Sequence, residues 1–247
     1  HASTAIIAKF FPKNKYFGLL LNNEINSLTK ALTNPKRPFT AIIGGAKISG
    51  KIDVIIALFE KVDNLIIGGG MAYTFAKAKG GRTGKSLVEN EKVNLAKKLI
   101  IQAKKKGVKL LLPSDSVNAL EFNNDAKTNT SDILYIDSNY MGLDIGSDTI
   151  AKFSKTIKQS KTLVWNGPMG VFEMENFENG TKKIAEAICV ATENGAFSLV
   201  GGGDSVAAIK KFNLEKKISY ISTGGGAMLK YLEGKPLPGV IAIQNNP

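Results

Sequence analysis

Two lysines beside a glycine pair are the first side chains in this sequence whose spacing points to chemistry. Lys47 follows Gly44-Gly45-Ala46, and Lys51 comes four residues later. If a helix begins here, both ammonium groups lie one turn apart near its N-terminus. The helix dipole already makes that end positive, so two cations there are favourable only if a polyanion shares the site. The spacing predicts a phosphate-binding site, while a solvated surface position stays open for Lys51.

A carboxylate after another glycine segment adds to this prediction. Asp204 comes directly after Gly201-Gly202-Gly203 and precedes Ser205. At the start of a helix, the Asp204 carboxylate could cap free backbone amides. A single carboxylate beside phosphates is also what Mg²⁺ commonly uses, with water and phosphate oxygens in its other positions. Both interpretations stay open, and the Ser205 hydroxyl could join the same coordination shell.

Histidine and cysteine chemistry has almost no support. His1 is the only histidine and Cys189 the only cysteine, which excludes an internal disulfide and a zinc cluster. Transfer of a phosphoryl group between a carboxylate and a nucleotide phosphate needs no general base, because both are ionised at neutral pH. Positioning and charge neutralisation suffice. The lone cysteine favours a reducing, cytoplasmic setting.

Glycine segments recur along the chain where apolar runs end. A single glycine there has ordinary structural causes, such as a positive φ angle or close helix packing. Backbone amides without side chains at helix N-termini also receive phosphate oxygens. Because the pattern recurs, we expect phosphate binding. The segments are Gly44-Gly45, Gly68-Gly69-Gly70, Gly201-Gly202-Gly203 and Gly224-Gly225-Gly226.

Two common nucleotide fingerprints are not met. The G-x-G-x-x-G pattern fails because Tyr73 and Val206 stand where its third glycine belongs. The segment 81–86 resembles a P-loop, but its first glycine is replaced by Lys79 and no apolar strand leads into it. We therefore do not expect a dinucleotide loop or a P-loop here.

The glycine segments need a sheet whose strands all end at one edge. Six apolar runs each pass into a turn of small residues, and continuous rather than alternating runs indicate strands covered on both faces. The sequence predicts an α/β fold, a doubly wound (Rossmann-like) six-stranded parallel sheet with helices on both faces. We expect its carboxyl edge to gather Gly45, Gly69, Asn166, Gly202 and Gly225 around one cleft. The runs are 40–43, 65–67, 110–112, 162–165, 197–200 and 220–223, and residues 118–140 lack this rhythm.

The rest of the chain is expected to lie outside this sheet domain, which spans 38–234. A helical segment at 18–33 is interpreted as a linker helix, and 235–247 has Pro236 and Pro238 close together near its start and has no helical period. The start at His1 suggests a fragment of a longer protein. The longest apolar runs are far short of the ~20 residues of a membrane helix.

The net charge of +12 favours an anionic partner. Arg37 and Arg82 are the only arginines, so the chain has few side chains that could form bidentate hydrogen bonds to nucleic-acid bases. A small anion is therefore favoured over nucleic acid, and no membrane partner is expected.

Several motifs in order along the chain resemble phosphoglycerate kinase. The string Trp165-Asn166-Gly167-Pro168-Met169-Gly170-Val171-Phe172-Glu173 is the most specific. The others are Gly44 to Lys47, Ile66 to Ala72, Met141 to Gly146, Gly201 to Asp204, Ser222 to Ala227 and the closing segment Leu232 to Val240. The resemblance implies a glycolytic phosphotransferase that moves a phosphoryl group between 1,3-bisphosphoglycerate and ADP, giving 3-phosphoglycerate and ATP. It also implies a monomer.

The resemblance assigns roles to individual residues. It implies that Lys47 neutralises the migrating phosphoryl group, with the amides of Gly224 and Gly225 facing that group. Lys51 and Asn166 match contacts to nucleotide phosphate, and Asp204 matches the Mg²⁺ ligand. Glu173 matches the ribose-binding carboxylate, and the adenine slot is matched by Leu87, Gly142, Leu143, Pro168 and Val171. Gly45, Gly69, Gly70, Gly167, Gly203 and Ser205 complete the expected ADP/ATP site.

The departures from the family pattern bear on activity. In that family the triose-phosphate site lies on an N-terminal domain, so 1–17 would be its remnant and 235–247 would pack on it. 3-Phosphoglycerate would bind through that missing domain, and the isolated chain is expected to be inactive. Asp204-Ser205 replaces the commoner Asp-Thr. A nucleotide-binding module without chemistry, an oxidoreductase and a basic nucleic-acid binder remain the alternatives.

Overall fold

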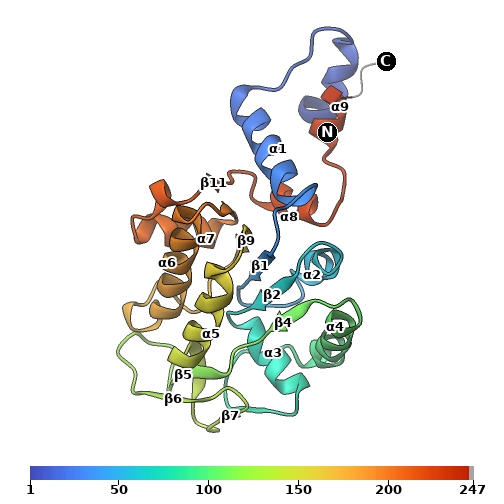
Figure 1. Ribbon diagram of the computed structural model, residues 1–247. Helices are drawn as coiled ribbons and strands as arrows, with labels where there is room; N and C mark the ends of the chain where they lie inside the picture. Colours follow the sequence, from blue (N-terminus) through green and yellow to red (C-terminus); the bar gives the residue numbers. More distant parts are fainter. Residues whose placement is uncertain (245–247) are drawn as a thin grey trace.

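A parallel six-stranded sheet forms the centre of the chain in the computed structural model, which describes residues 1–244 (Figure 1). Its strands are β1 (Phe39–Ile43), β2 (Asn64–Ile67), β4 (Lys109–Leu111), β9 (Thr162–Asn166), β10 (Phe197–Val200) and β11 (Tyr220–Ile221). Every neighbouring pair is parallel. The spatial order is β11-β10-β9-β1-β2-β4, so the chain order reverses between β9 and β1. The predicted doubly wound sheet is confirmed.

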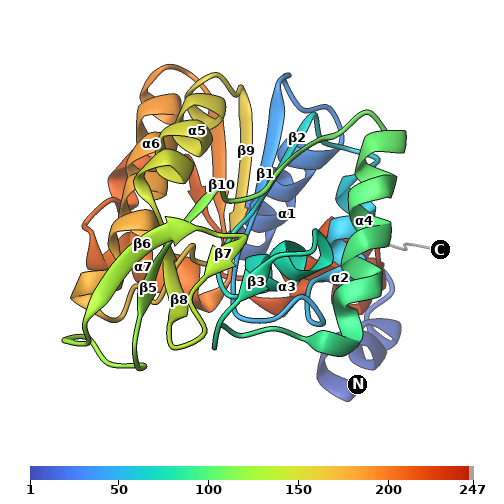
Figure 2. The same ribbon diagram turned by 90° about the horizontal axis from the view of Figure 1, so that it is seen from below.

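Helices cover both faces of this sheet, and Figure 2 shows α4 and α5 on opposite sides of it. One face is covered by α1 (Leu19–Leu32), α2 (Ile52–Leu58), α3 (Met71–Ala78), α4 (Val93–Lys105) and α8 (Gly226–Leu232). The other is covered by α5 (Ser147–Lys158), α6 (Asn179–Glu193) and α7 (Gly203–Lys211). Within β1, Ala41 and Ile43 belong to the first core and Ile42 to the second. Successive side chains point to opposite faces, so a continuous apolar run is what a doubly covered strand requires.

The stretch without strand rhythm, 118–140, joins neighbouring segments in two small sheets beside the main one. Strands β5 (Asp115–Ala119), β6 (Thr128–Asp132) and β8 (Met141–Ile145) make an antiparallel sheet. Strands β3 (Arg82–Thr83) and β7 (Tyr135–Ile136) pair in parallel. Short helical turns are η3 (Asn90–Lys92), η4 (Glu175–Phe177) and η5 (Glu215–Lys217). The hydroxyl of Ser86 accepts a hydrogen bond from the amide of Gly142 at 2.9 Å, which ties β8 to the segment after β3.

The two ends of the described chain pack against each other beside α1 (Figure 1). The first residues form the turns η1 (Ala2–Ile6) and η2 (Ile7–Phe10). The prediction that 235–247 has no helix is wrong for α9 (Pro238–Gln244). Proline has no amide hydrogen, which costs nothing at the first position of a helix. Residues 245–247 lie outside the described part, and within 1–244 every helix is too short or too polar to cross a bilayer.

Candidate functional site

The backbone after β1 meets the backbone after β9 where the strand order reverses. The amide of Gly44 donates to the Asn166 carbonyl at 2.9 Å, and that of Gly45 donates to the Pro168 carbonyl at 3.1 Å. A Cβ added to Gly44 would lie 2.1 Å from the Pro168 carbonyl oxygen. Glycine is therefore required for this approach. Such reversal points at the carboxyl ends of parallel strands are where open α/β sheets bind ligands.

A cavity of about 370 Å³ opens at this edge, and we call it the lysine cavity. The sequence analysis placed nine of its lining residues in the candidate site: Gly45, Lys47, Lys51, Asn166, Gly167, Gly203, Asp204, Ser205 and Gly225. They come from four strand ends of the main sheet. Gly202, which was expected at the same edge, also lines it.

The two lysines do not share a helix, which corrects the prediction. Helix α2 begins at Ile52, so Lys51 is its N-cap and Lys47 lies in the preceding loop. The amides of Ile48 and Ser49, which a longer helix would leave free, donate to the Glu89 carboxylate at 2.6 and 3.1 Å. The Glu89 side chain therefore satisfies these two backbone amides in a loop conformation, and the helix begins only at Ile52.

Lys51 is bound within the site, whereas Lys47 is exposed. The Lys51 ammonium donates to the side-chain oxygen of Asn166. The Asn166 amide nitrogen in turn donates to the Gly201 carbonyl at 2.8 Å. Burial lowers the pKa of Lys51, and the nearby charge of Asp204 partly opposes this. Because Asn166 is 1% exposed, its amide links Lys51 to the end of β10 as well as lining the cavity.

Asp204 lies in the first turn of α7, and its side chain makes no capping hydrogen bond. The capping interpretation is therefore wrong. The residue is exposed at the rim of the lysine cavity. Within residues 1–244, no group of three or more histidine, cysteine, aspartate or glutamate side chains could hold a metal alone. A lone exposed carboxylate suits a cation that takes its other ligands from phosphate and water.

Ser205 has a role that the sequence did not indicate. Its side chain is fully buried, and its hydroxyl oxygen accepts a hydrogen bond from the Gly167 amide at 2.6 Å. This bond fastens the loop after β9 to the first turn of α7. The Ser205 hydroxyl therefore makes a structural contact, and its place in a metal's coordination shell stays a prediction.

The last glycine triplet is divided between two roles. Gly225 lines the lysine cavity, and α8 begins directly after it. The predicted Gly224 does not line the cavity, and its amide donates to the Ser222 hydroxyl at 3.1 Å. Ser222 itself donates to Glu24, a buried carboxylate on α1. Glu24 also accepts from the Thr223 amide at 3.1 Å, so α1 holds this loop in place.

A second cavity of about 490 Å³ adjoins the first, and we call it the slot cavity. The two share Gly45, Ala46 and Asp204. The predicted single cleft is thus a pair of joined cavities. All remaining candidates line the slot: Gly69, Gly70, Leu87, Gly142, Leu143, Pro168, Val171 and Glu173.

Several slot residues were missed by the sequence analysis. Phe122 was not predicted, and it lines the slot together with the predicted Leu87; the two are 62% and 46% exposed. Their exposed apolar surface is what a flat hydrophobic ligand would cover. The only signal for Phe122 was an aromatic residue within a polar stretch. The other lining residues that were not predicted as site residues are Ala46, Tyr73, Lys85, Met141, Met169 and Gly170.

The segment rejected as a P-loop has a different use. No helix follows it directly, since residues 84–89 are turn and coil. Instead Lys85 and Leu87 line the slot, and the Ser86 hydroxyl accepts a hydrogen bond from the Gly142 amide. The segment therefore forms one wall of the slot.

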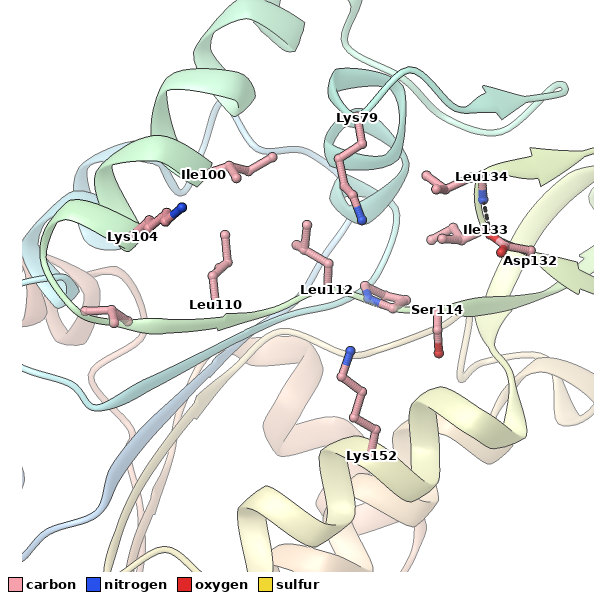
Figure 3. Close-up of a pocket in the computed structure, with 12 residues that line it drawn as sticks. Lys79, Ile100, Lys104, Leu110, Leu112, Ser114, Asp132, Ile133, Leu134 and Lys152 are labelled. Atoms are coloured by element: carbon pink, nitrogen blue, oxygen red, sulfur yellow. Dashed lines mark hydrogen bonds between the residues drawn. The ribbon is translucent and has the colours of Figure 1, made fainter.

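A third cavity of about 480 Å³ lies beside the edge strand β4 (Figure 3). Its walls are mostly apolar, and exposed Lys79, Lys104 and Lys152 surround it. It shares no lining residue with the lysine or slot cavities. This cavity is therefore separate from the predicted site at the glycine edge.

Comparison with known proteins is consistent with this geometry. The family model described as Phosphoglycerate kinase matches residues 1–235. The phosphoglycerate kinases of Porphyromonas gingivalis and Clostridioides difficile are 54% and 53% identical, over 99% of this chain and 59% and 60% of their own length. The solved phosphoglycerate kinase from Coxiella burnetii matches with a TM-score of 0.92 and 45% identity, covering 98% of this chain and 62% of that one. The chain thus spans about three fifths of the length of these relatives, and it belongs to the phosphoglycerate kinase family.

Proposed function

We propose that this chain is the nucleotide-binding half of a glycolytic phosphotransferase. The enzyme moves a phosphoryl group between 1,3-bisphosphoglycerate and ADP, giving 3-phosphoglycerate and ATP. The observation that carries this is the joined pair of cavities, an apolar slot that opens through Gly45 and Asp204 into a cavity with two lysines. The sequence of surfaces suits an adenine base, a ribose and a phosphate chain in that order.

The nucleotide lies across both cavities. The adenine lies between Leu87 and Phe122 on one side and Val171 on the other, and the exposed Glu173 accepts hydrogen bonds from ribose hydroxyls. The phosphates cross the Gly45 loop toward Lys51, whose ammonium is already positioned by a side-chain partner. A lysine held by partners loses less conformational entropy when it binds phosphate.

The Asp204 carboxylate at the lysine cavity would hold Mg²⁺, which would supply neutralisation of the phosphate charge there. Lys47 has a separate task. Its exposed ammonium lines the lysine cavity and follows the group in transfer. Since both reacting oxygens are ionised, the chain needs to supply only positioning and charge neutralisation.

The acceptor, 3-phosphoglycerate, binds to the part of full-length relatives that this chain does not span. Exposed apolar side chains near the start of the chain support a packing surface for that part. Phe10, Tyr16 and Leu19 are 76%, 79% and 86% exposed. In this proposal the enzyme is a cytoplasmic monomer without nucleic-acid or membrane partners, and the isolated chain binds nucleotide with negligible turnover.

Two substitutions in a full-length protein that contains this chain test the proposal. Lys47→Ala removes a charge that acts mainly in the transition state, so kcat falls by roughly a hundredfold or more, about 3 kcal/mol. Lys51→Ala removes a ground-state phosphate contact and mainly raises KM for MgATP. Steady-state kinetics with 3-phosphoglycerate separate the two patterns. A kcat within about twofold of the parent for Lys47→Ala, only ~0.4 kcal/mol, refutes the assignment and favours a binding module without chemistry.

A further inference from the structure

Glu89 lies outside both cavities but contacts the loop that carries Lys47. Its carboxylate accepts hydrogen bonds from the amides of Ile48 at 2.6 Å and Ser49 at 3.1 Å. These are the two residues that follow Lys47. Glu89 is distant from them in sequence, so the loop is held by a tertiary contact and not by local structure alone.

The segment around Glu89 is itself attached to the domain. The amide of Glu89 donates to the Thr74 hydroxyl at 3.1 Å, and Thr74 is 1% exposed within α3. Val88 packs against the first hydrophobic core. Leu87, two residues before Glu89, lines the slot cavity. One short segment therefore has one side chain at the slot and another on the loop of the lysine cavity.

The electrostatics agree with the contacts. Partial burial raises the pKa of Glu89. The hydrogen bonds from Ser49 and Ile48 and the charge of Lys47 lower this pKa by more than burial raises it, so it lies below the ordinary value. Glu89 is therefore ionised at neutral pH. A charged acceptor binds backbone amides more strongly than a neutral one.

We propose that Glu89 is a positioning residue that orients the Lys47 loop toward the nucleotide phosphates and links it to the adenine slot through Leu87. This rests on the proposed function, because it presumes that a nucleotide spans the two cavities. Without the carboxylate, the amides of Ile48 and Ser49 lose their acceptor, and the loop becomes free to move. Phosphate binding then weakens while base binding is retained.

The test uses the 247-residue chain and compares a ligand with phosphates to one without. Isothermal titration calorimetry measures Kd for MgADP and for adenosine with the parent, Glu89→Ala, Glu89→Gln and the control Glu91→Ala. Glu91 is exposed on η3 in the same segment and makes none of these contacts. We expect Glu89→Ala to weaken MgADP about tenfold, the scale of one hydrogen bond to a charged group. Adenosine should change less than about twofold.

The second variant separates the hydrogen bond from the charge. Glu89→Gln keeps a carbonyl acceptor, so MgADP should weaken by less than about threefold, and Glu91→Ala should match the parent. Amide hydrogen exchange of Ile48 and Ser49, measured without ligand, should be faster in Glu89→Ala than in the parent. Thermal melts establish whether each variant is folded. If Glu89→Ala is not folded, amide exchange in Glu89→Gln tests the proposal, and exchange at Ile48 and Ser49 faster than in the parent supports it.

Several results would overturn the proposal. These are unchanged MgADP affinity in Glu89→Ala, equal losses for MgADP and adenosine, or unchanged exchange at Ile48 and Ser49. Tighter MgADP binding by Glu89→Gln would show that the carboxylate only screens Lys47, which also contradicts it. A parent chain that binds neither ligand would instead refute the nucleotide site, and this inference with it.

Discussion

Gly44→Ala tests whether the close approach of two loops builds the site. The new Cβ would lie 2.1 Å from the Pro168 carbonyl oxygen and 2.5 Å from the Gly167 carbonyl oxygen. Ordinary contact begins at 3.4 Å, so the loops must separate by more than 1 Å. Both neighbours are backbone atoms, which cannot rotate away as a flexible side chain would. The separation also stretches the 3.1 Å hydrogen bond from Gly45 to Pro168.

The geometry sets the size of the effect. Overpacking of this kind costs about 1–3 kcal/mol, and the loss of one backbone hydrogen bond adds about 1 kcal/mol. At roughly 2–4 °C per kcal/mol for a chain of this length, Tm should fall by about 5–15 °C. Gly45 borders both cavities, so its displacement should weaken MgADP by about tenfold or more.

The assay pairs thermal unfolding with calorimetry of MgADP binding. Gly50→Ala is the matched control, because a Cβ at Gly50 meets nothing within 4 Å and the residue lies in the same loop. It should melt within about 2 °C of the parent, as expected for a surface substitution. If Gly44→Ala retains both the Tm and the MgADP affinity of the parent, the loops are not packed as described and the reasoning fails.

Two further predictions concern the slot and a buried carboxylate. Phe122→Ala should weaken adenosine and MgADP equally, by ~1–2 kcal/mol, with Tm unchanged because Phe122 is exposed; a loss for MgADP alone would contradict its place in the slot. Burial raises the pKa of Asp144 to about 7 although the amides of Gly180 and Ile145 donate to it. The protonated form is thus favoured in the folded chain, and stability falls as pH rises from about 4 to about 7. In Asp144→Asn the decrease in Tm between pH 5 and pH 8 should be smaller than in the parent, and an identical decrease would show that Asp144 does not titrate in this range.

The fold could be predicted because its main signals are local in sequence. Continuous apolar runs such as Ala41 to Ile43 require cover on both faces, since neighbouring side chains point in opposite directions. Glycines directly after the strands then place backbone amides at the carboxyl edge whatever the details of packing. Phe122 was missed because its one local signal, an aromatic residue within a polar stretch, does not distinguish a binding surface from an ordinary exposed side chain.

Most of the site could be predicted from motifs, but the state of its side chains could not. Sequence periodicity suggested one helix for Lys47 and Lys51, whereas Glu89, 41 residues from Ile48, holds that loop open. The Ser205 hydroxyl is occupied by an amide 38 residues away, and Ser222 is bound by Glu24 across 198 residues.

Hydrogen-bond partners of this kind depend on which loops the sheet brings together, so they cannot be predicted from the neighbouring residues in the sequence. The sequence by itself determined the strands, the glycine edge and the residue types gathered there. Only the tertiary structure decided which of those groups are free to meet a ligand, because a buried donor or acceptor is satisfied by whichever partner the fold places beside it.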